Sequence, residues 1–162
     1  MIIVDGYNFI YAMRGIEHRM PIDDLEAARR ELHEALVRFQ NIADEAVRVV
    51  YDARGGEPQH EAMGSLEIVF APPNTSADDY IARCVRHSPH PARITVVTSD
   101  KELGDRVKAA EGKVMRSAAF YKRLTETFEK GKNPPDDKSA EKPSRPSRDE
   151  IDFFLEEFGK DS

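Results

Sequence analysis

The chain has 162 residues, a net charge of −6 and a single cysteine, Cys84. This length suits one ordinary domain with a short tail. One cysteine excludes an intramolecular disulfide and a cysteine-built metal site, which favours a reducing, cytoplasmic compartment. No apolar run approaches the ~20 residues of a membrane helix, and the first residues lack the features of a secretory signal. The acidic charge counts against a generic nucleic-acid binder, because such domains are usually basic.

Apolar periodicity predicts alternating strands and helices over the first 130 residues. Strands are expected over residues 2–5, 46–52, 66–70, 93–98 and 113–116. Helices are expected over residues 22–44, 76–87, 101–111 and 117–129. Residues 54–64 are polar and are interpreted as a mobile loop between two strands. Strands separated by helices indicate an α/β fold, with a mainly parallel sheet covered on both faces.

The composition changes after the domain expected at residues 1–130. Residues 131–148 are predicted to form a flexible linker, because so polar a segment buries too little surface to offset the entropy of ordering. Residues 149–159 are predicted to form an amphipathic helix that packs on the domain or on a partner. A capping-box pattern precedes this helix, and its apolar residues share one face: Ile151, Phe154, Leu155 and Phe158.

Aspartates recur where the expected strands end. Asp5, Asp52 and Asp100 each follow a strand, while Asp78 and Asp79 lie in the first turn of a helix. Because parallel strands present their carboxyl ends at one edge, where ligands bind, these side chains can converge there. Each acid alone also fits a turn, a helix dipole or an N-cap. Together they repel one another, and such a cluster is typical of sites for Mg²⁺ or Mn²⁺ and a phosphodiester.

Several short motifs occur in the same order as in a known protein family. They are VDGYNFI at 4–10, VVYDA at 49–53, NTSADDYI at 74–81, VTSD at 97–100 and RSAAF at 116–120. Over roughly residues 1–130 the chain thus resembles the YacP-like NYN domains of the PIN-like ribonuclease superfamily. The resemblance implies a three-layer α/β/α fold and a divalent-metal-dependent endoribonuclease that cleaves RNA, which we expect to be mRNA.

The resemblance also implies roles for single residues. Asp5, Asp78 and Asp100 would bind Mg²⁺ or Mn²⁺, and Asp52 and Asp79 would assist as adjacent acids. Further roles follow by position: Asn8 would place a water or phosphate oxygen beside Asp5, and Thr98 or Ser99 would orient Asp100.

Affinity for RNA comes largely from phosphate contacts by Lys and Arg, for which a local patch suffices. Candidates for substrate binding near the same edge are Arg14 and Arg54 on loops, Ser99, Lys101, Arg116, Lys122 and Arg123. Two aromatic residues, Tyr7 and Phe9, are candidates for stacking on bases. The low overall basicity predicts modest affinity for naked RNA, and the resemblance leaves open a partner that presents the substrate, such as the ribosome.

Two alternatives remain at this point. A non-catalytic RNA- or ribosome-binding module would use the same cleft, and metal-dependent turnover distinguishes it from a nuclease. A phosphatase or phosphotransferase would be indicated by an aspartate nucleophile that is followed two residues later by a second acid. That position holds Tyr7, which argues against this alternative.

Overall fold

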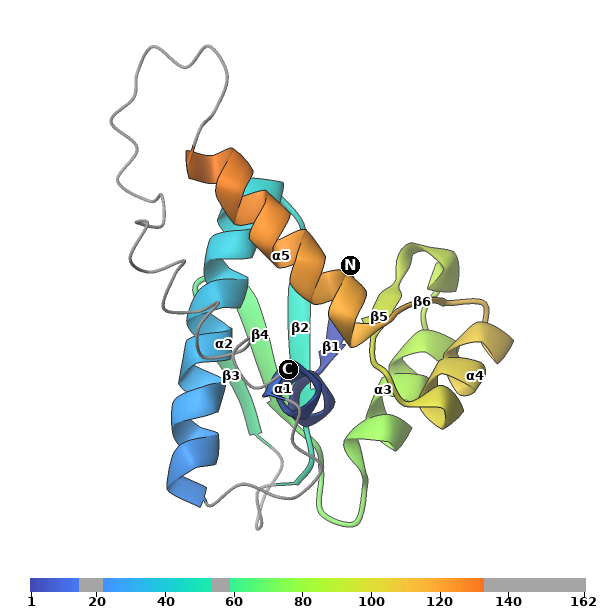
Figure 1. The fold of residues 1–162 in the computed structure, drawn as a ribbon. Helices are drawn as coiled ribbons and strands as arrows, with labels where there is room; N and C mark the ends of the chain where they lie inside the picture. Colours follow the sequence, from blue (N-terminus) through green and yellow to red (C-terminus); the bar gives the residue numbers. More distant parts are fainter. Residues whose placement is uncertain (15–21, 54–58, 133–162) are drawn as a thin grey trace.

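A computed structural model describes residues 1–14, 22–53 and 59–132 (Figure 1). The strands are β1 Ile2–Asp5, β2 Val47–Tyr51, β3 Gln59–Met63, β4 Leu66–Phe70, β5 Thr95–Val97 and β6 Lys113–Met115. The α-helices are α1 Gly6–Arg14, α2 Ile22–Ala43, α3 Ala77–Arg86, α4 Lys101–Ala109 and α5 Ser117–Lys132. The expected linker beyond Lys132 and the expected helix over 149–159 lie outside the described residues. None of the described helices is long and apolar enough to cross a membrane.

The strands form one mixed sheet in the order β3-β4-β2-β1-β5-β6, in which all neighbours are parallel except β3 and β4. Alternate strand residues face opposite layers. Ile2 and Val4 pack with α1, α2 and α5, whereas Ile3 packs with α3 and α4. The predicted α/β/α arrangement of three layers around a mainly parallel sheet is therefore confirmed (Figure 1).

Strand β3 occupies part of the segment interpreted as a mobile loop, so that interpretation was wrong for residues 59–63. β3 pairs antiparallel with β4, and Met63 lies opposite Leu66. The two residues between them begin with Gly64 at φ 59°, as in a two-residue hairpin turn with glycine first. An edge strand pairs on one side only, so this polar sequence has no need of the apolar pattern by which strands are recognised.

Helix α1 was not predicted, because no helix was expected between the strand that ends at Asp5 and the helix that begins at residue 22. Arg14, placed on a loop by the sequence, is instead the last residue of this helix. The side chains of Phe9, Ile10 and Met13 share its buried face. A helix of nine residues is too short for its apolar periodicity to be recognised in the sequence. Its stability comes from packing against the sheet and two other helices.

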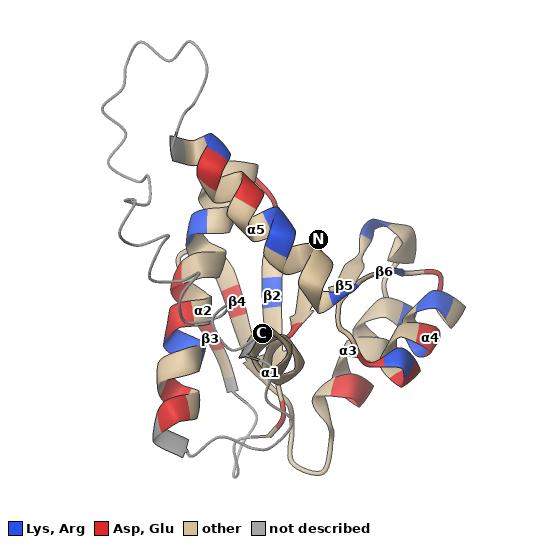
Figure 2. Ribbon diagram, viewed as in Figure 1, with Lys and Arg blue, Asp and Glu red and all other residues tan. Residues whose placement is uncertain are grey.

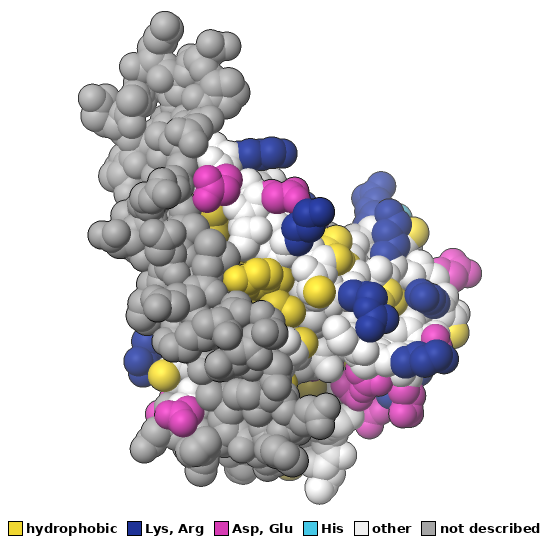
Figure 3. Space-filling view, in the orientation of Figure 1, with side chains coloured by type: hydrophobic (Ala, Val, Ile, Leu, Met, Phe, Trp, Pro, Cys, Tyr) yellow, Lys and Arg dark blue, Asp and Glu magenta, His cyan; other side chains and the backbone are white. Residues whose placement is uncertain are grey.

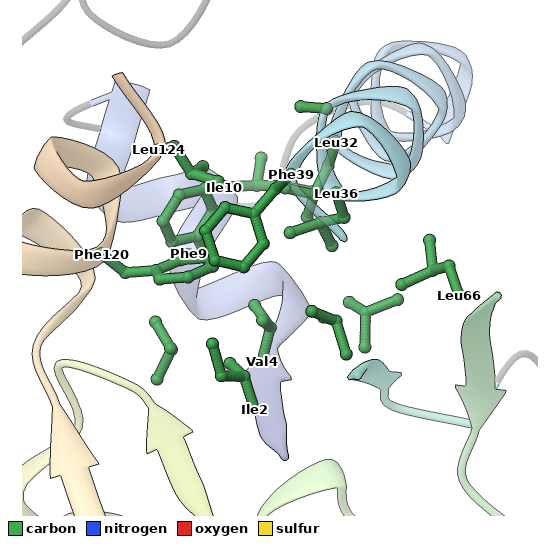
Figure 4. Packing of buried hydrophobic residues seen from close by; sticks show 14 of the residues in the cluster. Ile2, Val4, Phe9, Ile10, Leu32, Leu36, Phe39, Leu66, Phe120 and Leu124 are labelled. Atoms are coloured by element: carbon green, nitrogen blue, oxygen red, sulfur yellow. The ribbon is translucent and has the colours of Figure 1, made fainter. Parts of the chain in front are cut away.

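Phe9 lies in the core, which contradicts its expected role in stacking on bases. Its side chain is 0% exposed, and its ring meets Phe120 edge-on at 5.7 Å between centroids. Phe39 packs on the same Phe120 ring at 5.5 Å. Figure 4 shows the side chains of Phe9, Phe39 and Phe120 close together among α1, α2 and α5. The direction of α1 turns residue 9 toward the sheet, which the sequence motif did not reveal.

We expect Gly6→Ala to destabilise the fold by about 1–3 kcal/mol, the usual cost of overpacking a core. A Cβ at residue 6 would stand 2.2 Å from Cε1 of Tyr51, whose side chain is fully buried. Gly104→Ala on α4 is the matched control, because its nearest neighbour would be Val114 at 3.7 Å. That control is expected to be neutral or stabilising. Urea denaturation measures both, and equal effects would contradict the prediction.

Candidate active site

The candidate site lies at the carboxyl edge of the sheet, between β1 and β5. β2 pairs with one side of β1 and β5 with the other, so the strand order reverses here. Ligands of open α/β sheets bind at such a switch point. Asp5 ends β1, and Asp100 is the N-cap of α4 after β5. Acidic positions mark the starts of α3 and α4 in Figure 2, and acidic side chains gather there on the surface in Figure 3.

Strand alternation puts two of the acids on the same face of the sheet. Ile3 and Val50 pack against α3 and α4. Asp5 and Asp52 each come two residues later, and because side chains alternate along a strand, they lie on the same face. Asp78 and Asp100 stand at the starts of these two helices. Backbone periodicity and helix placement therefore bring four acids from four segments to one corner.

Asp5 is a buried carboxyl group, with 6% of the residue exposed. Burial raises its pKa to about 7, and the negative charges of Asp78, Asp52 and Asp100 add to the rise. A hydrogen bond from Oγ1 of Thr98 to Oδ2 of Asp5, at 3.1 Å, opposes it. Near neutral pH the fold thus holds an acid whose ionised form lacks a compensating positive charge.

Asp78 is half-buried, and the charges of nearby carboxylates change its pKa as well. Burial raises its pKa to about 6, and Asp100 adds to this through its charge and through a hydrogen bond that protonated Asp78 donates. Asp52 raises the pKa further, whereas Arg106 lowers it. The structure therefore brings Asp5, Asp52, Asp78 and Asp100 within electrostatic range of one another.

Three of these carboxylates are each fixed through one oxygen. Oδ1 of Asp52 accepts from the backbone N–H of Ala77 at 2.8 Å, and Oδ1 of Asp100 accepts from that of Glu102 at 2.9 Å. Asp5 is fixed through Oδ2 by Thr98, whose Oγ1 also accepts from the N–H of Asp100 at 3.1 Å. The ordinary N-cap explanation of Asp100 is thus correct, and among the described residues these bonds engage Oδ2 of Asp5, Oδ1 of Asp52 and Oδ1 of Asp100.

Asp79 is the acid that the structure does not bring to this group. Its Oδ1 accepts from Nη1 of Arg106 on α4 at 2.9 Å, and this contact holds the pKa of Asp79 below its usual value. Its backbone N–H donates to the Oγ of Ser76, the N-cap of α3. Asp79 therefore links α3 to α4, and its predicted assistance to catalysis has no geometric support.

Asn8 joins three segments around the site. Its Oδ1 accepts from the N–H of Ser99 at 2.9 Å and from Oγ of Ser117 at 3.2 Å. The Oγ of Ser99 in turn accepts from the N–H of Ser117 at 3.2 Å. The oxygen of Asn8 is thereby occupied, and only its amide nitrogen is left to meet a water or a phosphate. Ser117, buried and within the RSAAF motif, was not singled out from the sequence.

The basic candidates fall into different environments. Lys101 is highly exposed beside Asp100 and pairs with Asp105 at 3.0 Å. Arg116 is exposed just before α5, and Lys122 is exposed on that helix. Arg123 instead packs over the Phe39 ring and pairs with Glu45 at 2.6 Å, so it braces α5. Arg54 and the side chain of Arg14 lie outside the described residues.

Tyr7 is half-buried on α1, beyond the turn that follows Asp5. Its hydroxyl accepts from Nη1 of Arg29 at 3.1 Å, and its ring lies against Tyr51 with centroids 4.8 Å apart. Arg29, a buried residue of α2, was missed from the sequence. Nothing in its helical pattern distinguishes it, because its neighbours come from strands and helices distant along the chain.

The donor chemistry of the carboxylates fits a divalent cation. Asp5 and Asp78 have raised pKa values because like charges meet in a partly dry site, and a cation would relieve that repulsion. The described part of the chain contains no preformed cage of three or more His, Cys, Asp or Glu side chains.

Comparison with known proteins agrees with the fold. Two crystal structures of Rae1 (YacP) from Bacillus subtilis superpose with a TM-score of 0.70. The W164L mutant is 20% identical and covers 98% of this chain and 92% of its own; the other structure is 21% identical and covers 89% and 84%. No curated protein matches the sequence. The family model of the YacP-like NYN domain matches residues 2–156, so the chain belongs to the YacP-like NYN domain family, with its PIN-like fold.

Proposed function

We propose that this protein is a divalent-metal-dependent endoribonuclease that cleaves RNA, with mRNA as the expected substrate. The observation that carries the proposal is that Asp5, Asp52, Asp78 and Asp100 lie within electrostatic range of one another, where burial and the neighbouring negative charges raise the pKa values of Asp5 and Asp78. Membership of the YacP-like NYN family supports it, because this family lies within the PIN-like nuclease superfamily.

In this proposal Asp5, Asp78 and Asp100 would hold Mg²⁺ or Mn²⁺, whose charge would replace the proton shared between Asp78 and Asp100. The metal would supply a water of lowered pKa and neutralise the scissile phosphate. Thr98 fixes Asp5 and Asp100 relative to each other, since its hydroxyl contacts both residues. Asp52 fixes the first turn of α3, and with it Asp78, through the N–H of Ala77. The amide of Asn8 orients a water or a phosphate oxygen.

The decisive experiment incubates end-labelled single-stranded RNA with the protein and Mg²⁺ or Mn²⁺, beside the same reaction in excess EDTA. We expect internal cleavage with either metal and none with EDTA. Cleavage that persists in EDTA would contradict the metal requirement. Tight RNA binding without cleavage in both metals would favour the non-catalytic binding module instead.

Within the described residues, some of the basic candidates near the site are paired with acids, which supports weak affinity for naked RNA. Lys101 is partly neutralised by Asp105, and Arg123 is committed to Glu45. A ribosome that presents the substrate would compensate for this weakness and remains a prediction. If purified RNA is cleaved as fast as ribosome-bound RNA, no such partner is needed.

A further inference from the structure

Arg29 on α2 is a buried cation with an unusual set of neighbours. The residue is 9% exposed, and Nη1 donates to the Tyr7 hydroxyl at 3.1 Å. Its guanidinium carbon lies 5.9 Å from the centroid of the Tyr51 ring and 5.6 Å from that of Phe70. Within the described residues, no carboxylate forms an ion pair with Arg29.

A guanidinium removed from water without an anion is costly, and the two aromatic faces offset only part of that cost. Arg has five N–H donors, and the hydroxyl of Tyr7 uses one of them. Among the described residues, the hydrogen bond to Tyr7 engages Nη1, and the remaining N–H donors of the guanidinium are the groups that an anion would bind.

The position of Arg29 connects it with the carboxylates. Tyr51 and Phe70 end β2 and β4 at the carboxyl edge of the sheet. Asp52 follows Tyr51 directly, and Tyr7 follows Asp5 by two residues. Because strand residues alternate, Arg29 lies on the α1–α2 face of this edge, while the carboxylates lie on the α3–α4 face. A strand of RNA that crosses the edge would meet both.

The surroundings of Arg29 are fixed by a buried polar contact. Nε2 of His33 lies 2.7 Å from the Tyr51 hydroxyl. Burial and the charge of Arg29 lower the pKa of His33 to about 4, so this imidazole is neutral at neutral pH. Tyr7 also stacks on Tyr11, with ring centroids 6.2 Å apart and 20° between the planes. The network therefore presents one positive charge beside an ordered, half-buried aromatic pair.

We propose that Arg29 and Tyr7 form a nucleotide subsite next to the carboxylates, in which the guanidinium binds a backbone phosphate and the Tyr7 ring stacks on the adjoining base. This inference rests on the proposed ribonuclease function and assigns a residue to its substrate path. The planar fork of Arg suits phosphate oxygens, and base stacking on an aromatic ring is tolerant of sequence.

The test measures binding by fluorescence anisotropy, in EDTA, with two labelled probes. One probe is a 12-nucleotide single-stranded RNA and the other is an abasic ribose-phosphate chain of equal length. Arg29→Gln is expected to weaken binding of both probes on the order of 10-fold and to reduce the salt slope by about 0.7. Tyr7→Leu is expected to weaken RNA binding on the order of 10-fold, with the abasic chain unaffected.

Arg30→Gln is the matched control, because Arg30 is the exposed neighbour on the same helix. It is expected to change binding about twofold or less. Equal affinities and salt slopes for Arg29→Gln and Arg30→Gln would overturn the subsite. If Arg29→Gln does not unfold cooperatively, Arg29→Lys replaces it. Lysine keeps the positive charge but lacks the planar guanidinium, so RNA binding should weaken severalfold while the salt slope stays unchanged. Wild-type affinity in Arg29→Lys would then overturn the proposal.

The two proposals fail in distinguishable ways. If the wild-type protein binds RNA through Arg29 but does not cleave it with either metal, the nuclease proposal fails and the subsite stands. If it cleaves RNA and Arg29→Gln behaves like Arg30→Gln, the subsite fails alone. If the wild type binds neither probe, the subsite is overturned, and the cleavage assay with Mg²⁺ or Mn²⁺ decides the nuclease proposal separately.

Discussion

Asp5→Asn is expected to reduce RNA cleavage by at least about 100-fold, more than the loss of an outer partner of a metal ligand usually costs. Asn keeps the shape of Asp5 and an oxygen to accept from Thr98, so the fold should remain intact. Asn lacks the negative charge that the proposed cation needs. Single-turnover cleavage of labelled RNA with saturating Mg²⁺ measures the effect, and wild-type activity would contradict the assignment.

The same substitution is expected to stabilise the metal-free fold in a pH-dependent way. The pKa of Asp5 is about 7 in the folded state, against 3.8 for the ordinary group. Folding therefore favours the protonated form, and the stability that this gives is lost as the pH rises from about 4 to about 7. Asn never ionises, so its advantage over Asp grows through that window and then levels off. At pH 8 it should reach roughly 2–4 kcal/mol.

Urea denaturation in EDTA at pH 5, 6.5 and 8 measures this difference. Asp24→Asn is the control, because Asp24 is exposed on α2 and lies outside the carboxylate group. It should alter neither cleavage nor the pH dependence. An Asp5→Asn variant that is equally stable relative to wild type at all three pH values would show that Asp5 is not held as a buried, repelled acid.

The second large effect is a contrast between neighbours. Asp78→Asn is expected to reduce cleavage at least about 100-fold, because Asp78 faces Asp5 and Asp100. Asp79→Asn should leave cleavage within about threefold of wild type, because its carboxylate contacts Arg106 instead. The two variants differ by one position on the same helix turn, so total charge is matched, and the melts report the loss of the Asp79–Arg106 ion pair. Parallel cleavage assays with circular dichroism melts measure the contrast.

Equal losses in both variants would contradict the geometric separation of the two acids. Equal losses would mean that the Asp79–Arg106 contact opens when RNA binds. Equal retention of activity would remove Asp78 from the proposed metal site and leave Asp5 and Asp100 to hold the cation.

Several features follow from local patterns along the chain. The end of β1 at Asp5 and the N-caps Ser76 and Asp100 are set by apolar runs, alternation and capping, which act within a few residues. Parallel topology then brings these ends to one edge, which is why a common site for Asp5, Asp78 and Asp100 can be predicted from the sequence; their joint binding of a cation stays a prediction. The YacP-like NYN family was recognisable from the same motifs.

Only the tertiary structure separated residues that look alike in sequence. Asp78 and Asp79 are adjacent acids, yet the packing of α3 against α4 turns one toward the carboxylates and the other toward Arg106. Tyr7 and Phe9 differ likewise, because the direction of α1 buries Phe9 completely. Arg29 shows the limit most clearly: its aromatic neighbours come from three other elements, and such long-range contacts leave no periodic trace in the chain.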